Sequence, residues 1–200
     1  MIIVGICGRS GSGKSTVGMY ISEKYSYIDC DKVSREVTFK GSPCLDELCE
    51  SFGNEILNSD CSLNRGKLAS IAFSSPDKTK ELNRITHKYI TADIESKINF
   101  FKANGEKFVF IDAPTLFESK LNKKCDIIIS VVSNKENLLK RIISRDNKTT
   151  TEAEKRLSVQ YDDDFLINNS HYCIYNNGTL SQLKKSVLKL IETLEEKYGN

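Results

Sequence analysis

The segment Gly8–Thr16, which reads GRSGSGKST, constrains this chain more than any other feature. It matches the phosphate-binding loop pattern G-x-x-x-x-G-K-S/T, with Gly8, Gly13, Lys14 and Ser15 at the defining positions. An apolar, β-branched run, MIIVGIC, precedes the segment, and STVGMYISEKY, which has a helical pattern, follows it. Because strand, glycine-rich turn and helix form the setting that this motif requires, a chance glycine turn is the weaker interpretation.

The loop glycines, Gly8, Gly11 and Gly13, suit the close approach of an anion. Glycine tolerates φ > 0 and has no side chain that would keep phosphates away. The N–H groups of the loop and the N-terminus of the next helix can then bind a triphosphate. In this pattern Lys14 would reach the β- and γ-phosphates of ATP, and the Ser15 hydroxyl would ligate Mg²⁺.

The composition bounds the size of the fold and the kind of partner. The 200 residues, of which 39% are hydrophobic, suit one domain or one core with an inserted helical part. The net charge is +2 and the basic residues are dispersed, so we expect no nucleic-acid partner. Neither a signal peptide nor an apolar stretch near the ~20 residues of a membrane span is seen. We therefore expect a cytoplasmic protein without a membrane partner, as a monomer or a small homo-oligomer.

The seven cysteines are scattered without the spacing of metal ligands. Their odd number and the lack of a C-x-x-C pair favour reduced thiols over a zinc site. Cys7 and Cys173 are expected to be small core residues. His87 and His171 have no triad-like companions, so neither is a strong catalytic candidate.

Strand and helix patterns alternate along the chain. Strands are predicted at residues 1–7, 27–28, 107–111, 126–132 and 172–175. Helices are predicted after the phosphate loop, from about Lys32, at 43–53, 64–73, 76–105, 134–145 and at the C-terminus. This alternation predicts a three-layer α/β/α fold with a parallel five-stranded sheet. We expect a core of about 1–30 and 106–200, with a helical insertion at about 31–105 that binds a second substrate.

Carboxylates follow two of the predicted strands. Asp112 ends the strand FVFID, at the ligand edge of a parallel sheet, and could hold Mg²⁺ directly or through water. Asp29 and Asp31 follow the second strand and, on an extended backbone, would point the same way. We expect one of this pair to cap a helix or ligate, and the other to accept a proton from an acceptor hydroxyl.

The segment 141–160 is predicted to form a lid. Arg141 and Arg145 lie one helical turn apart, and polar residues, DNKTTT, follow them. Arginines on such a lid can neutralise charge on a transferring phosphoryl group, whereas a solvated helix face is the alternative. Thr151 and Glu154 have the spacing of a capping box for the next helix.

Several segments, in order, resemble those of the dephospho-coenzyme A kinase family. IDCDKVSREV resembles the family's I-D-A-D-x-x-A/S-R-x-V/L, and FGNEIL with DCSLNRGKLASIAF resembles F-G-x-x-I-L, D-G-x-L-N/D-R-x-x-L and V-F. IDAPTLFE is similar to D-x-P-L-L-F-E, and CIYNNGT is similar to I-x-N-x-G. RIISRD and TTTEAEKRLSVQ resemble the family's lid and its R-x-x-x-Q ending, here Arg156 and Gln160. The resemblance covers nearly the whole chain.

This resemblance implies ATP-dependent phosphorylation of the ribose 3′-hydroxyl of dephospho-coenzyme A, the last step of coenzyme A synthesis. It implies that Asp31 is the catalytic aspartate and that Lys14, Arg141 and Arg145 stabilise the transferring phosphoryl group. The implied ATP-binding residues are Gly8, Gly11, Ser12, Gly13, Lys14, Ser15 and Thr16, with Asn176, Asn177 and Gly178 near the adenine. The implied acceptor-binding residues are Asp31, Arg35, Asn64, Arg65 and His87. The expected metal ligands remain Ser15, from the phosphate-loop motif, and Asp112, from its place at a strand end.

The chain departs from the family pattern at four places. Arg9-Ser10 stands where the family has G-I, and Arg9 is equally compatible with a phosphate contact and with solvent exposure. Cys61 replaces a glycine, Thr115 replaces the first leucine of P-L-L, and Lys88 replaces the proline of H-P. The last two lie near the acceptor region, so they bear on acceptor contacts more than on phosphoryl transfer.

Two other functions compete with this interpretation. Another small-molecule kinase, for a nucleoside or nucleotide, would share the phosphate loop, but IDCDKVSREV and LNR fit it less well. A guanine-nucleotide switch would need N-K-x-D after the fourth strand, where Asn134-Lys135 is followed by Asn137 in place of the aspartate. A binding module without catalysis is the least favoured, because Asp31 and the lid arginines would have no role.

Overall fold

The structure, a computed structural model, describes residues 1–199. It contains a sheet of five strands in the order β2-β3-β1-β4-β5. The strands are β1 (Ile2–Cys7), β2 (Ser26–Asp29), β3 (Phe108–Asp112), β4 (Ile127–Val132) and β5 (Tyr172–Tyr175). β1 pairs in parallel with β3 and β4, and β4 pairs in parallel with β5. The predicted α/β fold with a parallel five-stranded sheet is confirmed.

The position of β1 in the sheet places the phosphate loop. β1 lies between β3 and β4, with Ile6 in register with Asp112 on one side and Ile129 on the other. Every residue of β3 and β4 is buried, as expected for parallel strands that are covered on both faces. The loop that follows Cys7 therefore leaves the carboxyl edge of the sheet between two neighbouring strand ends.

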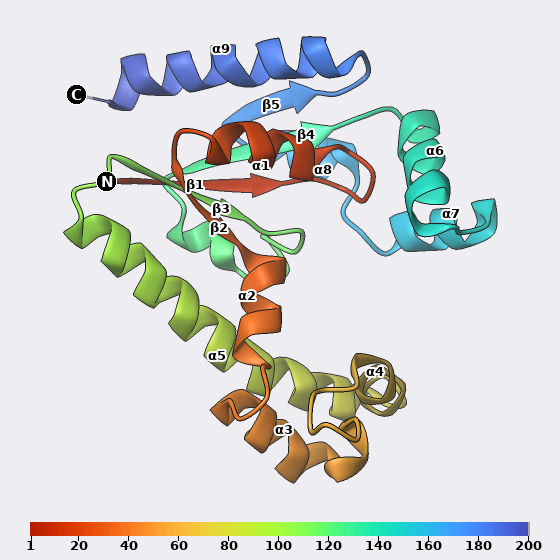
Figure 1. Ribbon diagram of the computed structural model, residues 1–200. Coiled ribbons are helices and arrows are strands. Elements are labelled where there is room, and N and C mark those ends of the chain that lie inside the picture. The colour runs from red at the N-terminus through yellow and green to blue at the C-terminus, as the bar shows by residue number, and fades with distance from the viewer. Residues whose placement is uncertain (200) are drawn as a thin grey trace. The chain divides into compact units, whose positions relative to one another are not determined.

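Helices cover both faces of this sheet. The helices α1 (Lys14–Ser22) and α9 (Leu180–Tyr198) pack together on one face (Figure 1). The side chains buried there are Val4, Ile6, Val17, Ile21, Phe108, Phe110, Ile127, Ile129, Val131, Ile174, Leu183, Val187, Ile191 and Leu194. On the other face α8 (Asp163–Asn168) packs against β4, and the 3-10 helix η2 (Leu121–Lys124) packs against β1. The result is the three-layer arrangement that the strand and helix alternation predicted.

The chain divides into two compact units. The first consists of Met1–Ile28 together with the chain from Phe101 onward, and the second is Asp29–Phe100. The second unit contains α2 (Cys30–Val37), α3 (Pro43–Phe52), the 3-10 helix η1 (Asn54–Ile56), α4 (Arg65–Ala72) and most of α5 (Pro76–Ala103). It has its own core of Cys44, Leu48, Phe52, Ile56, Leu68, Ala72 and Ile85. That this unit binds an acceptor stays a prediction.

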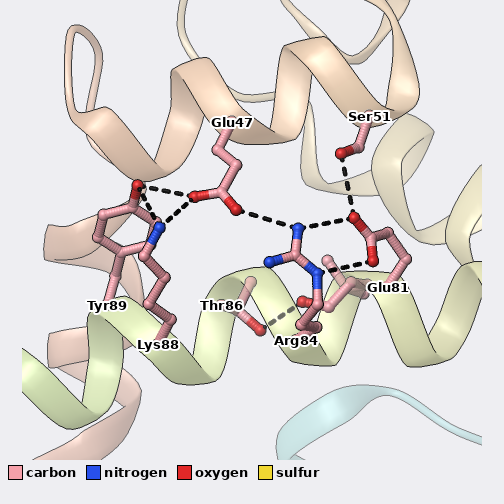
Figure 2. Close-up of polar contacts among 8 residues, drawn as sticks. Glu47, Ser51, Glu81, Arg84, Thr86, Lys88 and Tyr89 are labelled. Atoms are coloured by element: carbon pink, nitrogen blue, oxygen red, sulfur yellow. Dashed lines mark hydrogen bonds and ion pairs between the residues drawn. The ribbon is translucent and has the colours of Figure 1, made fainter.

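A polar network joins α3 to α5 within the second unit (Figure 2). Glu47 accepts hydrogen bonds from Arg84 at 3.0 Å and from Lys88 and Tyr89 at 2.8 Å each. Arg84 also donates to Glu81, which accepts from the Ser51 hydroxyl at 3.3 Å. The hydrogen bonds from Lys88 and then Tyr89 lower the pKa of Glu47 from its ordinary 4.5 to about 2. Because Glu47 is a paired carboxylate, the network favours its charged form.

Two further helices, α6 (Lys135–Asp146) and α7 (Thr150–Ser158), pack against each other through Leu138, Ile142, Ala153 and Leu157. The predicted capping box at Thr151 and Glu154 is wrong. The capping pair is Thr149 and Glu152, because the helix begins two residues earlier, at Thr150. The Thr149 hydroxyl accepts from the Glu152 N–H at 3.3 Å, and the Glu152 carboxylate accepts from the Thr149 N–H at 2.9 Å.

All seven cysteines are free thiols. Cys7 is buried at the end of β1, as predicted, and burial raises its pKa to about 12. Cys173 is only half-buried, which contradicts the prediction of a core residue. Its strand, β5, is the last strand of the sheet, so one of its sides lacks a neighbouring strand.

None of the helices described between residues 1 and 199 has the length and apolar character needed to cross a membrane.

Candidate active site

The phosphate loop connects Cys7, the last residue of β1, to Lys14, the first residue of α1. Gly11 and Gly13 have φ values of 81° and 94°, in the left-handed region that favours glycine, as predicted. Gly8 has no positive φ; its constraint is space, because a Cβ there would lie 2.6 Å from the Val131 carbonyl oxygen. A Cβ at Gly13 would collide with the Asn176 side-chain amide. The loop therefore needs glycine for two different physical reasons.

Lys14 and Asp112 form an ion pair inside the first unit. Their side chains are only 11% and 7% exposed. The Tyr27 hydroxyl donates to the second carboxylate oxygen, Oδ2, at 2.6 Å, while Lys14 Nζ contacts Oδ1. The acidic residue at the end of β3 thus lies beside the lysine of the phosphate loop, which is where a P-loop enzyme needs a carboxylate.

The candidate metal ligands are oxygen donors of the kind that Mg²⁺ prefers. Ser15 is exposed in the first turn of α1, and the preceding residue, Lys14, contacts Asp112. Mg²⁺ is usually held by one or two protein groups together with substrate phosphates and water, so this pair fits the ion. Among residues 1–199 no group of three or more His, Cys, Asp and Glu side chains could hold a metal.

Arg141 and Asn176 donate hydrogen bonds to main-chain oxygens of the phosphate loop. Arg141 donates from Nη1 to the main-chain oxygen of Gly11 at 3.0 Å and from Nη2 to that of Asn176 at 3.0 Å. The Asn176 side-chain amide donates to the main-chain oxygen of Ser12 at 2.7 Å. Asn176 is only 6% exposed, and Arg141 is half-buried. Arg141 therefore contacts the base of the loop, which differs from the predicted placement on a mobile lid.

Arg145 lies elsewhere on α6, in an ion-pair cluster with Asp146 and Arg156. Arg145 donates to both carboxylate oxygens of Asp146 at 2.7 and 2.9 Å, and Arg156 donates to Oδ2 at 2.7 Å. The Arg145 side chain is 56% exposed. Arg145 and Arg141, one turn apart in sequence, thus have separate partners.

The departure Arg9-Ser10 links the phosphate loop to the end of α7. Arg9 Nη2 donates to the Leu157 carbonyl oxygen at 3.0 Å, and the Ser10 N–H donates to Gln160 Oε1 at 3.0 Å. Within residues 1–199, the buried Nε of Arg9 has no hydrogen-bond partner. Of the two interpretations weighed for Arg9, solvent exposure is wrong, since the side chain is half-buried and engaged.

Asp29 and Asp31 have different environments in the second unit. Asp29 caps α2, and its Oδ1 accepts from the N–H groups of Asp31 and Lys32 at 2.9 and 3.1 Å. Asp29 ends β2 on an extended backbone, but α2 already begins at Cys30, so Asp31 is helical and the pair does not share the extended backbone that was considered. Asp31 is exposed in the first turn, and no hydrogen bond to its carboxylate occurs within residues 1–199.

The remaining acceptor candidates also lie in the second unit. Arg65 Nη2 donates to the Thr38 hydroxyl at 2.7 Å. Asn64 caps α4 by accepting from the Lys67 N–H at 3.0 Å. Arg35 of α2 and His87 of α5 have exposed side chains.

Besides Arg9-Ser10, two departures from the family pattern have structural explanations. Cys61 has a φ of 63°, so it occupies a left-handed position that glycine adopts without strain. Lys88 takes part in the network on Glu47. Nothing in the structure explains Thr115.

Sequence reasoning missed one residue of the site, Tyr27, and did not foresee the contacts of another, Asn177. Tyr27 was part of a short apolar run, and no pattern indicated that its hydroxyl reaches Asp112. Asn177 was placed near the adenine, but its Oδ1 accepts from the Asn134 N–H at 2.8 Å and the Ser133 hydroxyl at 3.1 Å. Gly178, beside it, has the Gln182 side chain so close that a Cβ would collide with it.

Comparisons with known proteins agree with one another. Residues 2–182 match the family model described as dephospho-CoA kinase. A dephospho-CoA kinase from Corynebacterium glutamicum is 35% identical over 96% of each chain, and one from Listeria innocua is 39% identical over 94% of this chain and 95% of the relative. A solved structure from Thermus thermophilus has the same fold, with a TM-score of 0.82, 24% identity and coverage of 96% of this chain and 97% of that one. The chain therefore belongs to the dephospho-CoA kinase family and is a kinase.

Proposed function

We propose that this kinase transfers the γ-phosphoryl group of ATP to the ribose 3′-hydroxyl of dephospho-CoA. The observation that carries the proposal is the division of roles between two neighbouring carboxylates. Asp29 is committed to capping α2, whereas no hydrogen bond to Asp31 occurs within residues 1–199. A carboxylate that is exposed and unengaged can accept a proton from a substrate hydroxyl.

In this proposal the phosphate loop and the N-terminus of α1 bind the triphosphate. Lys14 exchanges its partner Asp112 for the β- and γ-phosphates, and Arg145 stabilises the charge on the transferring group. Ser15 and Asp112 would hold Mg²⁺, which supplies neutralisation of phosphate charge when bound. Arg141 and Asn176 keep the loop in shape.

In the proposed reaction one bond to the γ-phosphorus forms and one breaks. The 3′-hydroxyl oxygen forms a bond to the γ-phosphorus, and the bond from that phosphorus to the β,γ-bridging oxygen breaks. The hydroxyl proton passes to Asp31, and ADP leaves. Exclusion of water by the segment 141–160 would limit the competing hydrolysis of ATP.

The acceptor would be held by residues of the second unit. Arg35, Arg65 and His87 are proposed acceptor contacts, supported by the resemblance of their segments to those of the family and, for Arg35 and His87, by exposure. Asn64 would contribute chiefly by capping α4.

The proposal includes three expectations about location, partners and assembly. We propose a cytoplasmic location, no nucleic-acid or membrane partner, and an assembly no larger than a small homo-oligomer. The dispersed charge and the net charge of +2 support the absence of a nucleic-acid partner.

The test is incubation of the purified protein with Mg²⁺-ATP and dephospho-CoA, with coenzyme A detected by mass spectrometry. The expected result is product well above that of an Asp31→Asn control. If the protein binds ATP but forms no product, the assignment of dephospho-CoA as the acceptor is contradicted, whereas the assignment of the ATP site stands. Nucleosides would then be assayed as acceptors.

A guanine-nucleotide switch gains no support from the structure. The Asn134 side-chain oxygen accepts from the Asn137 N–H at 2.9 Å and caps α6. A preference for ATP over GTP in the same assay would exclude that alternative.

A further inference from the structure

The carboxylate of Asp112 is held by two donors of different character. Lys14 contacts Oδ1 as a cation, and Tyr27 donates a neutral hydroxyl to Oδ2 at 2.6 Å. The Asp112 side chain is 7% exposed, so water offers it few alternative partners. When one donor leaves, the other therefore determines how the carboxylate is oriented.

The Tyr27 side chain can reach this carboxylate only because α1 has a glycine beside it. A Cβ at Gly18 would collide with the Tyr27 hydroxyl. Gly18 lies four residues after Lys14, so both are on the same side of α1, one turn apart. The missing side chain at Gly18 leaves room for the tyrosine ring below the lysine that contacts Asp112.

We propose that Tyr27 is a positioning residue for Asp112 during binding of the magnesium nucleotide. The proposal rests on the part of the proposed function in which Lys14 moves to the phosphates and Asp112 faces Mg²⁺. Once Lys14 has moved, the Tyr27 hydroxyl still holds Oδ2, and Oδ1 is presented to the ion or to its water shell. Tyr27 itself does not touch the reacting atoms.

A purely structural role predicts a different outcome. If Tyr27 only satisfied a buried oxygen, its removal would lower the stability of the fold and affect nucleotide binding equally with and without Mg²⁺. If Tyr27 positions Asp112, its removal changes the Mg²⁺ dependence of ATP binding and leaves metal-free binding unchanged. The two roles therefore separate in a binding experiment that needs no acceptor and no turnover.

The matched variants are Tyr27→Phe and Tyr25→Phe. Each loses one hydroxyl from the same part of the chain, but Tyr25 donates to Glu195 of α9. ATP binding is measured by isothermal titration calorimetry over a series of Mg²⁺ concentrations and in EDTA. For Tyr27→Phe we expect the Mg²⁺ concentration at half-effect to rise about 10- to 150-fold, as for a lost hydrogen bond to a charged group. Tyr25→Phe should match the wild type.

Three results would overturn the proposal. They are an unchanged Mg²⁺ dependence in Tyr27→Phe, an equal shift in Tyr25→Phe, and an equal loss of ATP affinity with and without Mg²⁺. Because the assay contains no dephospho-CoA, it stays informative even if the wild type makes no coenzyme A. Failure of the proposed reaction and failure of the positioning role are thus distinguishable.

Gly18→Ala tests the hydrogen bond between Tyr27 and Asp112 without changing either residue. Gly18→Ala keeps the tyrosine but displaces its hydroxyl, so it should raise the Mg²⁺ requirement in the same direction. In the double variant with Tyr27→Phe the shifts should not add, since both changes remove one interaction. Fully additive shifts would contradict the shared mechanism.

Discussion

Arg141 Nη1 lies 3.0 Å from the main-chain oxygen of Gly11 and donates a hydrogen bond to it across 130 residues of sequence. Through this contact α6 supports a loop residue whose φ of 81° favours glycine. The same guanidinium reaches the main-chain oxygen of Asn176, after β5. One side chain therefore couples the shape of the phosphate loop to the end of the sheet's last strand.

Replacement of Arg141 should weaken ATP binding. A hydrogen bond to a charged group contributes about 1.5–3 kcal/mol, so Arg141→Ala should raise the dissociation constant of ATP at least about 10-fold. Arg141→Lys should recover only part of the loss, because an ammonium cannot reproduce the planar fork. Lys140→Ala, an exposed neighbour, is the control, and calorimetry gives the constants. Equal affinity of Arg141→Ala and the control would show that these hydrogen bonds are dispensable.

The two carboxylates at the start of α2 should respond differently to amide substitution. Asp31→Asn should lower kcat by about 10²- to 10⁴-fold with a similar KM for ATP, the range for a lost general base. Asp29→Asn should keep both activity and stability, because asparagine caps helices as well as aspartate does. Asp29→Ala should cost about 0.5–2 kcal/mol of unfolding free energy. Steady-state kinetics and urea unfolding check these outcomes. Full turnover by Asp31→Asn would contradict the assignment of Asp31 as the general base.

The network on Glu47 should make stability depend on pH in the acid range. The folded-state pKa is lowered from 4.5 to about 2, so the contribution is fully present above pH 4.5 and is lost as pH falls through about 2. The difference in unfolding free energy between wild type and Glu47→Gln should therefore shrink as the pH decreases over this window. Urea titrations at several pH values measure it. A difference that does not change with pH would mean that ionisation of Glu47 is not responsible.

The observed capping box gives a direct test of where α7 begins. Thr149→Ala removes the cap and should destabilise the helix by about 0.5–2 kcal/mol, with faster hydrogen exchange of the α7 amides. Thr151→Ala should have little effect, because Thr151 lies inside the helix and alanine has the higher helix propensity. A larger effect of Thr151→Ala than of Thr149→Ala would instead support the capping box at Thr151 and Glu154 that the sequence pattern predicted.

Strong local patterns explain what the sequence predicted well. The phosphate loop, the alternation of elements and the apolar runs of β3 and β4 depend on spacing and on burial, which a sequence records directly. Thr149 and Thr151 show where such patterns become ambiguous. In the run TTTEAE two threonine–glutamate pairs have capping-box spacing, so the spacing alone does not distinguish them, and in the structure the first pair forms the cap.

The contacts of Arg141 and Tyr27 could not be predicted, because they join elements that are distant in sequence. Arg141 had the spacing of an exposed helix face, but the loop it supports lies 130 residues earlier. Tyr27 and Asp112 are separated by 85 residues and meet only because β2 is next to β3 in the sheet. Hydrophobic periodicity contains no information on which distant strand becomes a neighbour.

The strand order also determines when β1 can pair with its neighbours during synthesis on a ribosome. β1 is made first, but its partners β3 and β4, in register at Phe108 and Ile127, come after the whole unit Asp29–Phe100. At about 5–20 residues per second, an apolar strand with two open edges stays without its partners for several seconds. The second unit, with a core formed from one continuous segment, can fold during that delay. We therefore expect the rate of synthesis and the access of chaperones to β1 to affect the yield of this enzyme.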